Sequence, residues 1–570
     1  MSFLREKTIR GGIVRLYDDH FSMIADGIPV FSFPVSCNID TESSDRDLFL
    51  SAPQIREDDR VLACEWTAVS EVWRKKTYLL DIFPDGCYFR IRLEGNGTPT
   101  SVRYFTGHIK GSLNAGTEFE AAGYALPEAA NFDGPRMTRF INHDGSIGMG
   151  FMTPPPLVFP FWTVGTNGID CNTWVGVGLA PRRGQYNFNR FFYRVNNAAN
   201  RCSFELPLEG RTTVSGEWEA QGIWCGFGRD AADTVSEYAE FLYAHDFCTR
   251  GSRNKERFWY GPLYCGWGDQ VEWGGTLLSD DHLNAACQSF YSTLSDLLDS
   301  RDLHPTAIII DDKWQGKYGE LLPDPEKWPD LRAFTDEQHA KGRRVLLWVK
   351  VWNAEGLDAD ECMLLENQPY AADPTSPKYR KRVCDTVHKL LSDEAGCYNC
   401  DGFKLDFVNC VLMHPAIRPY DRSVFGLELV RRMVELFYDA AKAAKPDALV
   451  NNSCAHPYFA DITDQVRLHD YRDSMRSMMP VMEYRRDMFH AAMPDALIDT
   501  DSSNRSNYRE AKEYCMRAAE LGVPDLYLIG DAREFRFTEA DWDDVRAVWE
   551  DYSAKADEQY RTEHANTEEI

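Results

Sequence analysis

The sequence predicts an antiparallel β-sandwich followed by a (β/α)8 barrel. Residues 1–245 form short segments of alternating polar and apolar residues separated by turn residues, which is typical of antiparallel sheets with one buried face. A polar linker at 246–257 follows. Residues 258–570 then alternate short apolar runs with helix-length segments, a pattern that indicates repeated βα units around a parallel sheet.

The clearest strand of the predicted sandwich covers residues 87–93, where apolar and polar side chains alternate. Asp85-Gly86 precedes it and Asn96-Gly97 follows it, and we interpret both dipeptides as hairpin turns. Gln185–Asn189 is a second alternating stretch. The pattern turns helical at Asp230–His245, so we expect one helix before the linker.

The barrel prediction depends on eight apolar, β-rich runs within about 300 residues, close to the ~250 residues typical of this fold. Helical patterns at Phe425–Ala444 and Tyr508–Leu521 lie between the runs, and Trp542–Ala554 supplies a closing helix. The alternative is an open doubly wound sheet, which would leave edge strands unpaired. The eight predicted strands are Trp259–Trp267, Thr306–Asp312, Val345–Val351, Gly402–Phe407, Ala448–Ser453, Gln465–Asp470, Ala496–Asp501 and Asp525–Asp531.

Charge and cysteine usage restrict the partners and the compartment. With 89 acidic and 62 basic side chains the net charge is -27, which argues against nucleic acid and anionic membranes as partners. The first residues lack the apolar core of a secretory signal, so we expect a cytoplasmic protein. The 16 scattered cysteines favour reduced thiols, and we interpret Cys397 and Cys400 as buried structural thiols.

Carboxylates close most of the predicted barrel strands, and barrel enzymes place their active sites at that carboxyl-terminal end. A single strand-end Asp is more often a helix cap, and we assign Asp499 and Asp531 to that role. Lysines end two strands, at or near Lys350 and Lys404, which capping does not explain. The strand-end carboxylates are Asp311, Asp312, Asp406, Asp470, Asp499, Asp501 and Asp531.

Lys404 and Asp406 lie two residues apart, so a strand points both side chains to the same face. If that face is the barrel interior, the ammonium keeps Asp406 ionised, as a nucleophile requires. Glycoside hydrolysis also needs a second carboxyl group that donates a proton to the leaving oxygen. Asp470 is our candidate, and Asp473 is the fallback, which otherwise caps the next helix.

Three blocks of the chain resemble the retaining α-galactosidases of glycoside hydrolase family 36 and their clan relatives in families 27 and 31. The blocks are Ile-Ile-Asp311-Asp312-Lys-Trp314-Gln with Pro-Glu-Lys-Trp-Pro-Asp330; Gly402-Phe-Lys404-Leu-Asp406; and Asn451-Asn-Ser-Cys454 leading to His469-Asp470-Tyr-Arg-Asp473. The strand-two Asp-Asp-x-Trp and the strand-four Lys-x-Asp are specific in combination.

This resemblance implies a role for each matching residue. Asp406 matches the nucleophile and Asp470 the acid/base, while Asp311, Asp312 and Lys404 match residues that bind sugar hydroxyls. It also implies that Trp348 stacks on the sugar and that Cys454 lies in the loop near the second carbon of the sugar. A β-sandwich before the barrel also fits family 36.

The chain departs from the family pattern at three places. Lys350 replaces a usually acidic residue, and Glu366 replaces an arginine. This double inversion indicates an exchanged ion pair, a different hydroxyl pattern or an anionic substituent on the substrate. Ala455-His456-Pro457-Tyr458 replaces a glycine-rich loop, which changes what fits at the second carbon of the sugar.

The resulting prediction is a retaining, exo-acting, α-galactosidase-like enzyme that acts on a glycoside or oligosaccharide without cofactor or metal. Trp267 is the aromatic residue we assign to a sugar subsite. His414, His456 and His469 invite a metal site, but they lack metal-ligand spacing. The alternatives are a related enzyme with another sugar specificity, a metal-dependent barrel hydrolase or epimerase, and a non-catalytic sugar-binding barrel. The oligomeric state stays open, a homo-oligomer included.

Overall fold

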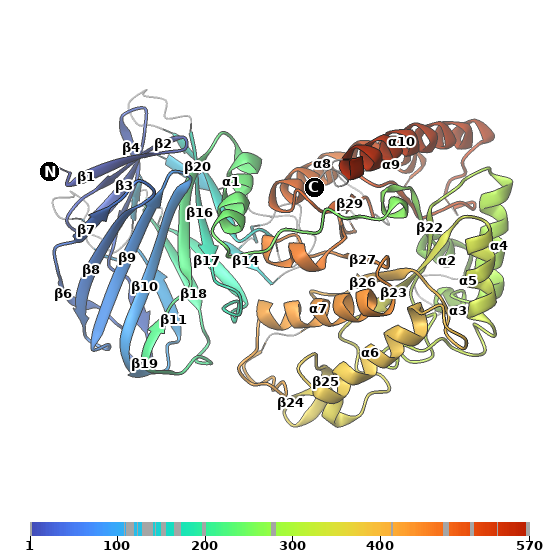
Figure 1. The fold of residues 1–570 in the computed structure, drawn as a ribbon, viewed down its shortest axis with the longest axis horizontal. Helices are drawn as coiled ribbons and strands as arrows, with labels where there is room; N and C mark the ends of the chain where they lie inside the picture. The colour runs from blue at the N-terminus through green and yellow to red at the C-terminus, as the bar shows by residue number, and fades with distance from the viewer. Residues whose placement is uncertain are drawn as a thin grey trace.

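The computed structural model describes residues 3–107, 109, 119–121, 124–127, 141–142, 144–149, 155–164, 173–196, 201–274, 281–411, 414–470, 478–501, 507–532 and 534–565. The chain folds into two parts that lie side by side, a strand-rich amino-terminal part and a helix-rich carboxyl-terminal part (Figure 1).

Two antiparallel sheets form the amino-terminal part. The first has the order β1-β2-β3-β4-β12-β18-β11-β5, with β17 paired to β18 and β14 to β17. Its strands are β1 (Arg5–Ile9), β2 (Gly12–Leu16), β3 (His20–Ala25), β4 (Ile28–Pro34), β5 (Asn38–Asp40), β11 (Ser101–Tyr104), β12 (Phe119–Ala121), β14 (Ser146–Gly148), β17 (Arg190–Asn196) and β18 (Arg201–Pro207).

The second sheet has the order β13-β15-β16-β20-β10-β9-β8-β6, with β19 paired to β10 and β7 to β8. Its strands are β6 (Asp47–Leu50), β7 (Gln54–Glu57), β8 (Leu62–Ser70), β9 (Lys75–Phe83), β10 (Gly86–Gly97), β13 (Tyr124–Pro127), β15 (Val158–Val164), β16 (Thr173–Ala180), β19 (Val214–Glu219) and β20 (Gly222–Gly228).

The predicted strand at 87–93 is the centre of β10, and its apolar side chains are buried. The turn expected at Asn96-Gly97 is wrong, because both residues continue β10 and pair with Ser215 and Val214. The strand expected at Gln185–Asn189 is also wrong. That stretch is a loop between β16 and β17 that belongs to neither sheet, and the backbone oxygens of Tyr186 and Phe188 accept hydrogen bonds from the barrel.

Contacts between the two parts gather on that loop and on one helix. Tyr186 stacks on Tyr458 with ring centroids 3.7 Å apart. Leu427 N donates to Phe188 O over 3.0 Å. The predicted helix is α1 (Ala231–Ala244), which begins after its cap Asp230 and packs against both β20 and the barrel helix α8 (Met479–Ala492). Residues 245–256 form neither helix nor strand, and the domain boundary expected there stays a prediction.

Eight parallel strands follow in sequence order around the barrel. They are β21 (Leu263–Cys265), β22 (Ala307–Ile310), β23 (Arg344–Lys350), β26 (Gly402–Asp406), β27 (Leu449–Asn452), β28 (Gln465–Arg467), β29 (Leu497–Asp499) and β30 (Asp525–Leu526). β30 pairs with β21, and a parallel bridge from Asp499 to Val523 joins β29 to the segment before β30. The sheet thus closes on itself, so the open doubly wound alternative is wrong.

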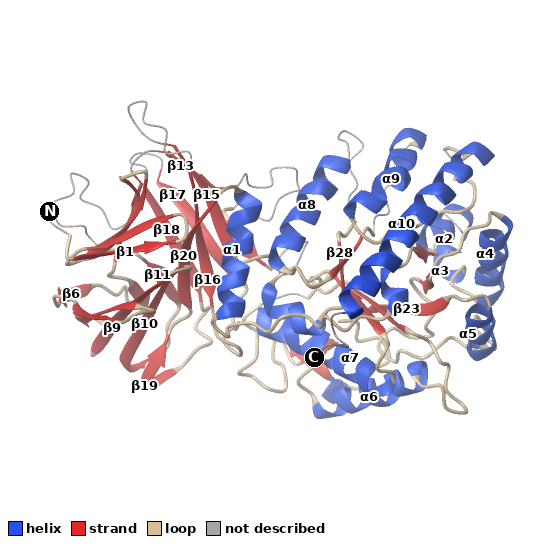
Figure 2. Cartoon of the chain, turned by 45° about the horizontal axis from the view of Figure 1, so that its top comes forward, coloured by secondary structure: helices blue, strands red, loops and turns tan. Residues whose placement is uncertain are grey.

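Helices surround the barrel on its outside (Figure 2). They are α2 (Trp267–Gly274), α3 (Asp281–Asn284), α4 (Gln288–Ser300), α5 (Leu331–Ala340), α6 (Pro377–Leu391), α7 (Leu427–Ala444), α8 (Met479–Ala492), α9 (Tyr508–Leu521) and α10 (Glu539–Ala565), with 3-10 turns η1 (Arg257–Tyr260), η2 (Ala359–Glu361) and η3 (Pro457–Ile462) and a hairpin of β24 (Cys362–Leu365) and β25 (Gln368–Ala372). Among the described residues, none of the helices combines the length and apolarity needed to cross a bilayer.

Side chains alternate between the barrel interior and the helical layer, as the period of a strand requires. Leu346 belongs to the small apolar cluster that includes residues of several strands inside the barrel, whereas Leu347 packs in the large cluster with the helices. Phe403 and Leu405 likewise belong to the outer cluster. Lys404 and Asp406 therefore share one face, as the sequence predicted, and that face is the barrel interior.

Three local predictions differ from the structure. The first predicted strand is shortened to β21, because a 3-10 turn precedes it and Trp267 already begins α2. Asp499 is not a helix cap, since it is buried in β29 and Asn507 caps α9. Asp531 lies eight residues before α10 and forms an ion pair with Arg536.

Candidate active site

Asp406, the last residue of β26, is held by three hydrogen-bond donors. Arg467 Nη2 donates to its Oδ1 over 2.8 Å, and Trp348 Nε1 donates to its Oδ2 over 3.0 Å. The third donor is Phe407 N, 2.8 Å from Oδ1. The side chain of Asp406 nevertheless remains 20% exposed. The carboxylate is thus fixed in orientation but accessible from the carboxyl-terminal end of the barrel.

Positive charge controls the protonation of Asp406. Burial alone would raise its pKa, but the Arg467 guanidinium, with further contributions from His469 and Lys404, holds that pKa well below its usual range. Phe407 has φ of +58°, a left-handed conformation that a bulky residue rarely adopts. In this conformation the backbone N–H of Phe407 donates to the carboxylate of Asp406. The site therefore contains an anion at neutral pH.

Lys404, two residues before Asp406 in β26, is buried in a network of polar groups. Its Nζ donates to Asp311 Oδ2 over 3.1 Å and to the Tyr527 hydroxyl over 2.7 Å, and Asp501 Oδ1 is 3.7 Å away. Burial lowers the pKa of Lys404, but Asp311 and Asp501 more than offset this and raise it well above its ordinary value. The ammonium is permanently charged and is neutralised by these carboxylates.

Asp312 and Lys350 lie at the rim of the barrel, and both are only partly buried. Burial raises the pKa of Asp312 to about 6, against the lowering effect of a 2.6 Å hydrogen bond from the Tyr318 hydroxyl. Lys350 pairs in register with Asp406, and its ammonium lies 4.7 Å from the Phe407 ring centroid and 5.1 Å from that of Tyr318. The resemblance had assigned sugar contacts to Asp311, Asp312 and Lys404, and these three residues do lie at one end of the barrel.

Asp470 lies just beyond β28, the strand that supplies Arg467. The strand ends at Arg467, and His469 then turns the chain with φ of +66°. Arg485, from α8, holds this turn by donating to the backbone oxygens of Leu468 and His469, each over 2.7 Å. Asp470 is partly buried, and its fallback Asp473 lies outside the described residues.

Four other expected residues are placed as follows. Trp348 is 2% exposed and donates its indole N–H to Asp406. Cys454 is fully buried in the core. Trp267 is half-buried at the start of α2, where its ring meets that of His282 edge to face. Of the three explanations offered for Lys350 and Glu366, the exchanged ion pair is wrong, because Glu366 occupies the exposed tip of the β24–β25 hairpin.

Sequence reasoning missed Arg467, which links Asp406 to Asp501. Its Nη1 donates to Asp501 Oδ2 over 2.5 Å, and its side chain is 2% exposed. The sequence did contain a sign of this role. Gln465 and Arg467 alternate with the apolar Val466, and a strand therefore points both polar side chains to the face opposite Val466, which is the barrel interior. A buried cation at a strand end requires a carboxylate partner.

The three histidines considered as metal ligands each contact a different part of the chain. His456 is buried beside Tyr238, and burial lowers its pKa to about 3. His469 accepts from Asp470 N, and exposed His414 accepts from Ala416 N. Among the described residues, a different group brings possible metal-ligating atoms close together: His388, Glu394 and Cys397. Cys400 is buried as expected, whereas Cys397 is partly exposed, so that half of the expectation is wrong.

No family model matches the chain, and no curated protein matches it by sequence. Solved structures do match. An α-N-acetylgalactosaminidase from Bifidobacterium bifidum is 12% identical with a TM-score of 0.59, over 97% of this chain and 93% of that one. A family 31 α-xylosidase from a soil metagenome, complexed with xylose, is 13% identical with a TM-score of 0.53, over 98% and 86%.

A family 31 sulfoquinovosidase from E. rectale is 12% identical with a TM-score of 0.51, over 97% of this chain and 85% of that one. These identities are low, and the likeness concerns the fold. The chain therefore has the multi-domain fold of antiparallel sheets and a (β/α)8 barrel that it shares with these enzymes.

Proposed function

We propose that the chain is a retaining α-glycosidase, with Asp406 as the nucleophile and Asp470 as the general acid/base. The observation that carries this proposal is the state of Asp406: an ionised carboxylate, oriented by three donors and still accessible. A carboxylate nucleophile has to be deprotonated and fixed in direction before the substrate arrives. Asp406 also lies at the carboxyl-terminal end of a barrel strand, where barrel enzymes place their active sites.

In the proposed mechanism, an Asp406 oxygen attacks the anomeric carbon while Asp470 transfers its proton to the departing glycosidic oxygen. The sugar is then an ester of Asp406. Asp470, now ionised, removes a proton from water, and the hydroxide oxygen displaces Asp406 from the anomeric carbon. Two inversions give net retention. Trp348 and Arg467 keep Asp406 aligned in both steps.

An α-galactosidase-like, exo-acting specificity is our first choice for the sugar. It rests on the resemblance of the Asp-Asp-x-Trp and Lys-x-Asp blocks, and the shared fold with three α-glycosidases supports the α-linkage. In this scheme Asp311, Asp312 and Lys404 bind sugar hydroxyls. Carboxylates that accept from hydroxyls discriminate strongly against a sugar that lacks them, since a buried acceptor is then left unpaired.

Azide rescue tests the two roles separately. With an activated aryl α-galactoside, we expect Asp406→Gly to be inactive alone and to give the β-galactosyl azide when azide is added. Asp470→Ala with azide should give the α-galactosyl azide, because Asp406 still forms the ester. If both variants gave an azide of the same configuration, the assignment would be wrong.

Leaving-group dependence distinguishes Asp470 from Asp473. Loss of the acid harms substrates with poor leaving groups most, because an acidic phenol departs without a proton. We therefore expect kcat/KM of Asp470→Ala to fall steeply as the phenol becomes less acidic, while Asp473→Ala follows the wild-type dependence. The reverse result would transfer the role to Asp473.

A second candidate substrate class, a glycoside with an anionic substituent, is favoured by Lys350. No carboxylate of the described residues lies within 4.0 Å of its ammonium, whereas Lys404 below it has Asp311 at 3.1 Å. A cation without a close ion-pair partner at the rim of the site would attract a sulfonate or carboxylate on the sugar.

Substrate pairs of different charge test this second candidate. We expect Lys350→Met to reduce kcat/KM for a sulfoquinovoside or galacturonide far more than for the neutral galactoside. The matched control is Lys313→Met, because Lys313 also lies against the Tyr318 ring, at 4.0 Å, but is paired with Glu355. If Lys350→Met affected neutral and anionic substrates equally, the neutral galactoside would remain the favoured class.

Chelator treatment separates these proposals from a metal-dependent barrel hydrolase or epimerase. Two protein carboxyl groups complete the proposed reaction. Turnover should therefore be the same before and after exhaustive dialysis against a chelator, and loss that divalent ions restore would favour the rival.

A further inference from the structure

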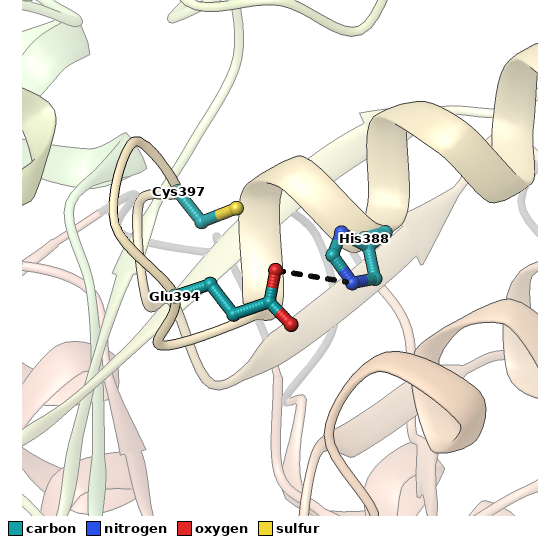
Figure 3. A group of neighbouring side chains, drawn as sticks. All are labelled: His388, Glu394 and Cys397. Carbon is teal, nitrogen blue, oxygen red and sulfur yellow. Dashed lines mark ion pairs between the residues drawn. The ribbon is translucent and has the colours of Figure 1, made fainter.

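A cluster of three possible metal ligands lies on the barrel surface, away from the candidate active site. His388 belongs to the last turn of α6, and Glu394 and Cys397 belong to the loop that leads from α6 to β26. Their side chains face one another in Figure 3, and the ligand atoms all lie within 4.8 Å of one another. His388 Nε2 and Glu394 Oε2 are 4.0 Å apart.

The backbone that carries these side chains is fixed by the fold. Cys397 N donates to Glu394 O over 3.0 Å, and Gly396 between them adopts φ of +88°, which only glycine tolerates readily. Arg332, from α5, donates its Nη1 to the backbone oxygens of Asp393 and Cys397, each over 3.2 Å. Metal binding would therefore need side-chain rotation but no rearrangement of the loop.

An imidazole, a carboxylate and a thiolate are the ligand types of zinc sites, with metal bonds of about 2.0–2.3 Å. Tetrahedral geometry with such bonds places ligand atoms about 3.3–3.6 Å apart, so these side chains need shifts of roughly 1 Å. The two anionic ligands would neutralise a divalent ion. His388 and Glu394 side chains are 51% and 69% exposed, which leaves a fourth position open to water.

We propose that His388, Glu394 and Cys397 bind one zinc-class divalent cation at the amino-terminal side of β26. The ion would not take part in the reaction proposed above, because Asp406 ends β26 and the strand itself extends about 15 Å. It would join α6 to the loop that leads into the strand carrying Lys404 and Asp406, and would stabilise the folded chain by binding only that state. This inference is independent of the proposed sugar chemistry.

Cobalt titration of the tag-free, full-length, chelator-treated protein tests the site, since a thiolate–cobalt bond gives a charge-transfer absorption that carboxylates alone do not. We expect this absorption to saturate at one cobalt per chain and to be displaced by zinc. Zinc should also raise the melting temperature.

Variants with matched controls assign the ligands. Cys397→Ser should lose the charge-transfer absorption, and His388→Gln and Glu394→Gln should weaken binding while keeping side-chain size. The controls are Cys384→Ser, an exposed thiol on the same helix, and His490→Gln, an exposed histidine in the last turn of α8. They should bind as wild type does. Absence of saturable binding in the wild type, or equal losses in Cys384→Ser and Cys397→Ser, would overturn the proposal.

Discussion

Asp406 and Asp525 are both aspartates of the barrel interior, but their surroundings favour the ionised form of Asp406 and the neutral form of Asp525. Asp406 receives three donors and the charge of Arg467. The two carboxyl oxygens of Asp525 have no hydrogen-bond partner in the described structure, and burial together with Asp499 and Asp501 raises its pKa well above the ordinary value. Burial is common to both, so the placement of cations decides which carboxyl ionises.

This difference separates a carboxylate held ready to react from a neutral acid buried in the same barrel interior. At the end of β26, a cation and two further N–H groups keep a carboxylate charged and directed. At Asp525, the lack of donors favours the neutral acid, which a dry interior accepts at lower cost than an anion.

The largest expected effect concerns turnover. Asp406→Asn keeps the shape of the side chain but removes the negative charge, so we expect kcat to fall by more than ~10³-fold. Asp525→Asn should stay close to wild type, because a neutral acid is replaced by a neutral amide. Initial rates with an aryl α-galactoside measure both, on protein freed of contaminating enzyme. Wild-type turnover in Asp406→Asn would contradict Asp406 as the nucleophile, whereas a lack of turnover in the unmodified protein would favour a non-catalytic sugar-binding barrel.

Removal of Arg467 should have the next largest effect, on stability. Arg467→Met leaves Asp406 and Asp501 without their shared cation, and breaking a buried ion pair costs about 3–5 kcal/mol. Chemical denaturation measures this loss. The control is Arg10→Met, which breaks an exposed pair with Glu237 and should cost about 0–1 kcal/mol. Equal losses would mean that Arg467 is not the cation that sustains the site.

The same substitution should change stability in opposite directions at the two aspartates. The lowered pKa of Asp406 contributes stability that is present above its unfolded pKa of ~3.9 and lost as pH falls through the folded value, so Asp406→Asn should be destabilised at neutral pH. The raised pKa of Asp525 makes the folded state bind a proton that the unfolded state has released, so stability falls as pH rises above ~3.9.

Asp525→Asn should remove that slope and be more stable than wild type at neutral pH, by about 1 kcal/mol or more per pKa unit of displacement. Urea unfolding of wild type and both variants, at mildly acidic and mildly alkaline pH, provides the comparison. Shifts of the same sign in both variants would contradict the assigned charge states.

The smallest expected effect concerns Asp312 at the rim. Its pKa of about 6 means that it accepts hydroxyl hydrogen bonds above that pH and loses charge below it. We expect kcat/KM for the galactoside to decrease severalfold as pH falls through about 6. Asp312→Asn should lower kcat/KM at neutral pH and remove this limb of the profile. An unchanged limb would assign it to another group, such as Asp470.

Much of the fold was predictable because its signals are local. The alternation at 87–93, the eight βα units and α9 (Tyr508–Leu521) follow from side-chain periods that neighbouring residues reveal. The failures occurred where long-range pairing overrides a local pattern. Asn96-Gly97 resembles a turn, yet β19 pairs with it from 120 residues away. The Gln185–Asn189 loop alternates because buried Tyr186 stacks on Tyr458 of the barrel and buried Phe188 stacks on Tyr186.

The sequence by itself determined the order of the elements and the shared face of Lys404 and Asp406, since strand geometry fixes both within a few residues. Only the tertiary structure decided the charge state of these groups. Arg467 reaches Asp406 across 61 positions of sequence, and Asp311 reaches Lys404 across 93. Electrostatic energy depends on distance in space and on burial, neither of which the spacing of residues along the chain records.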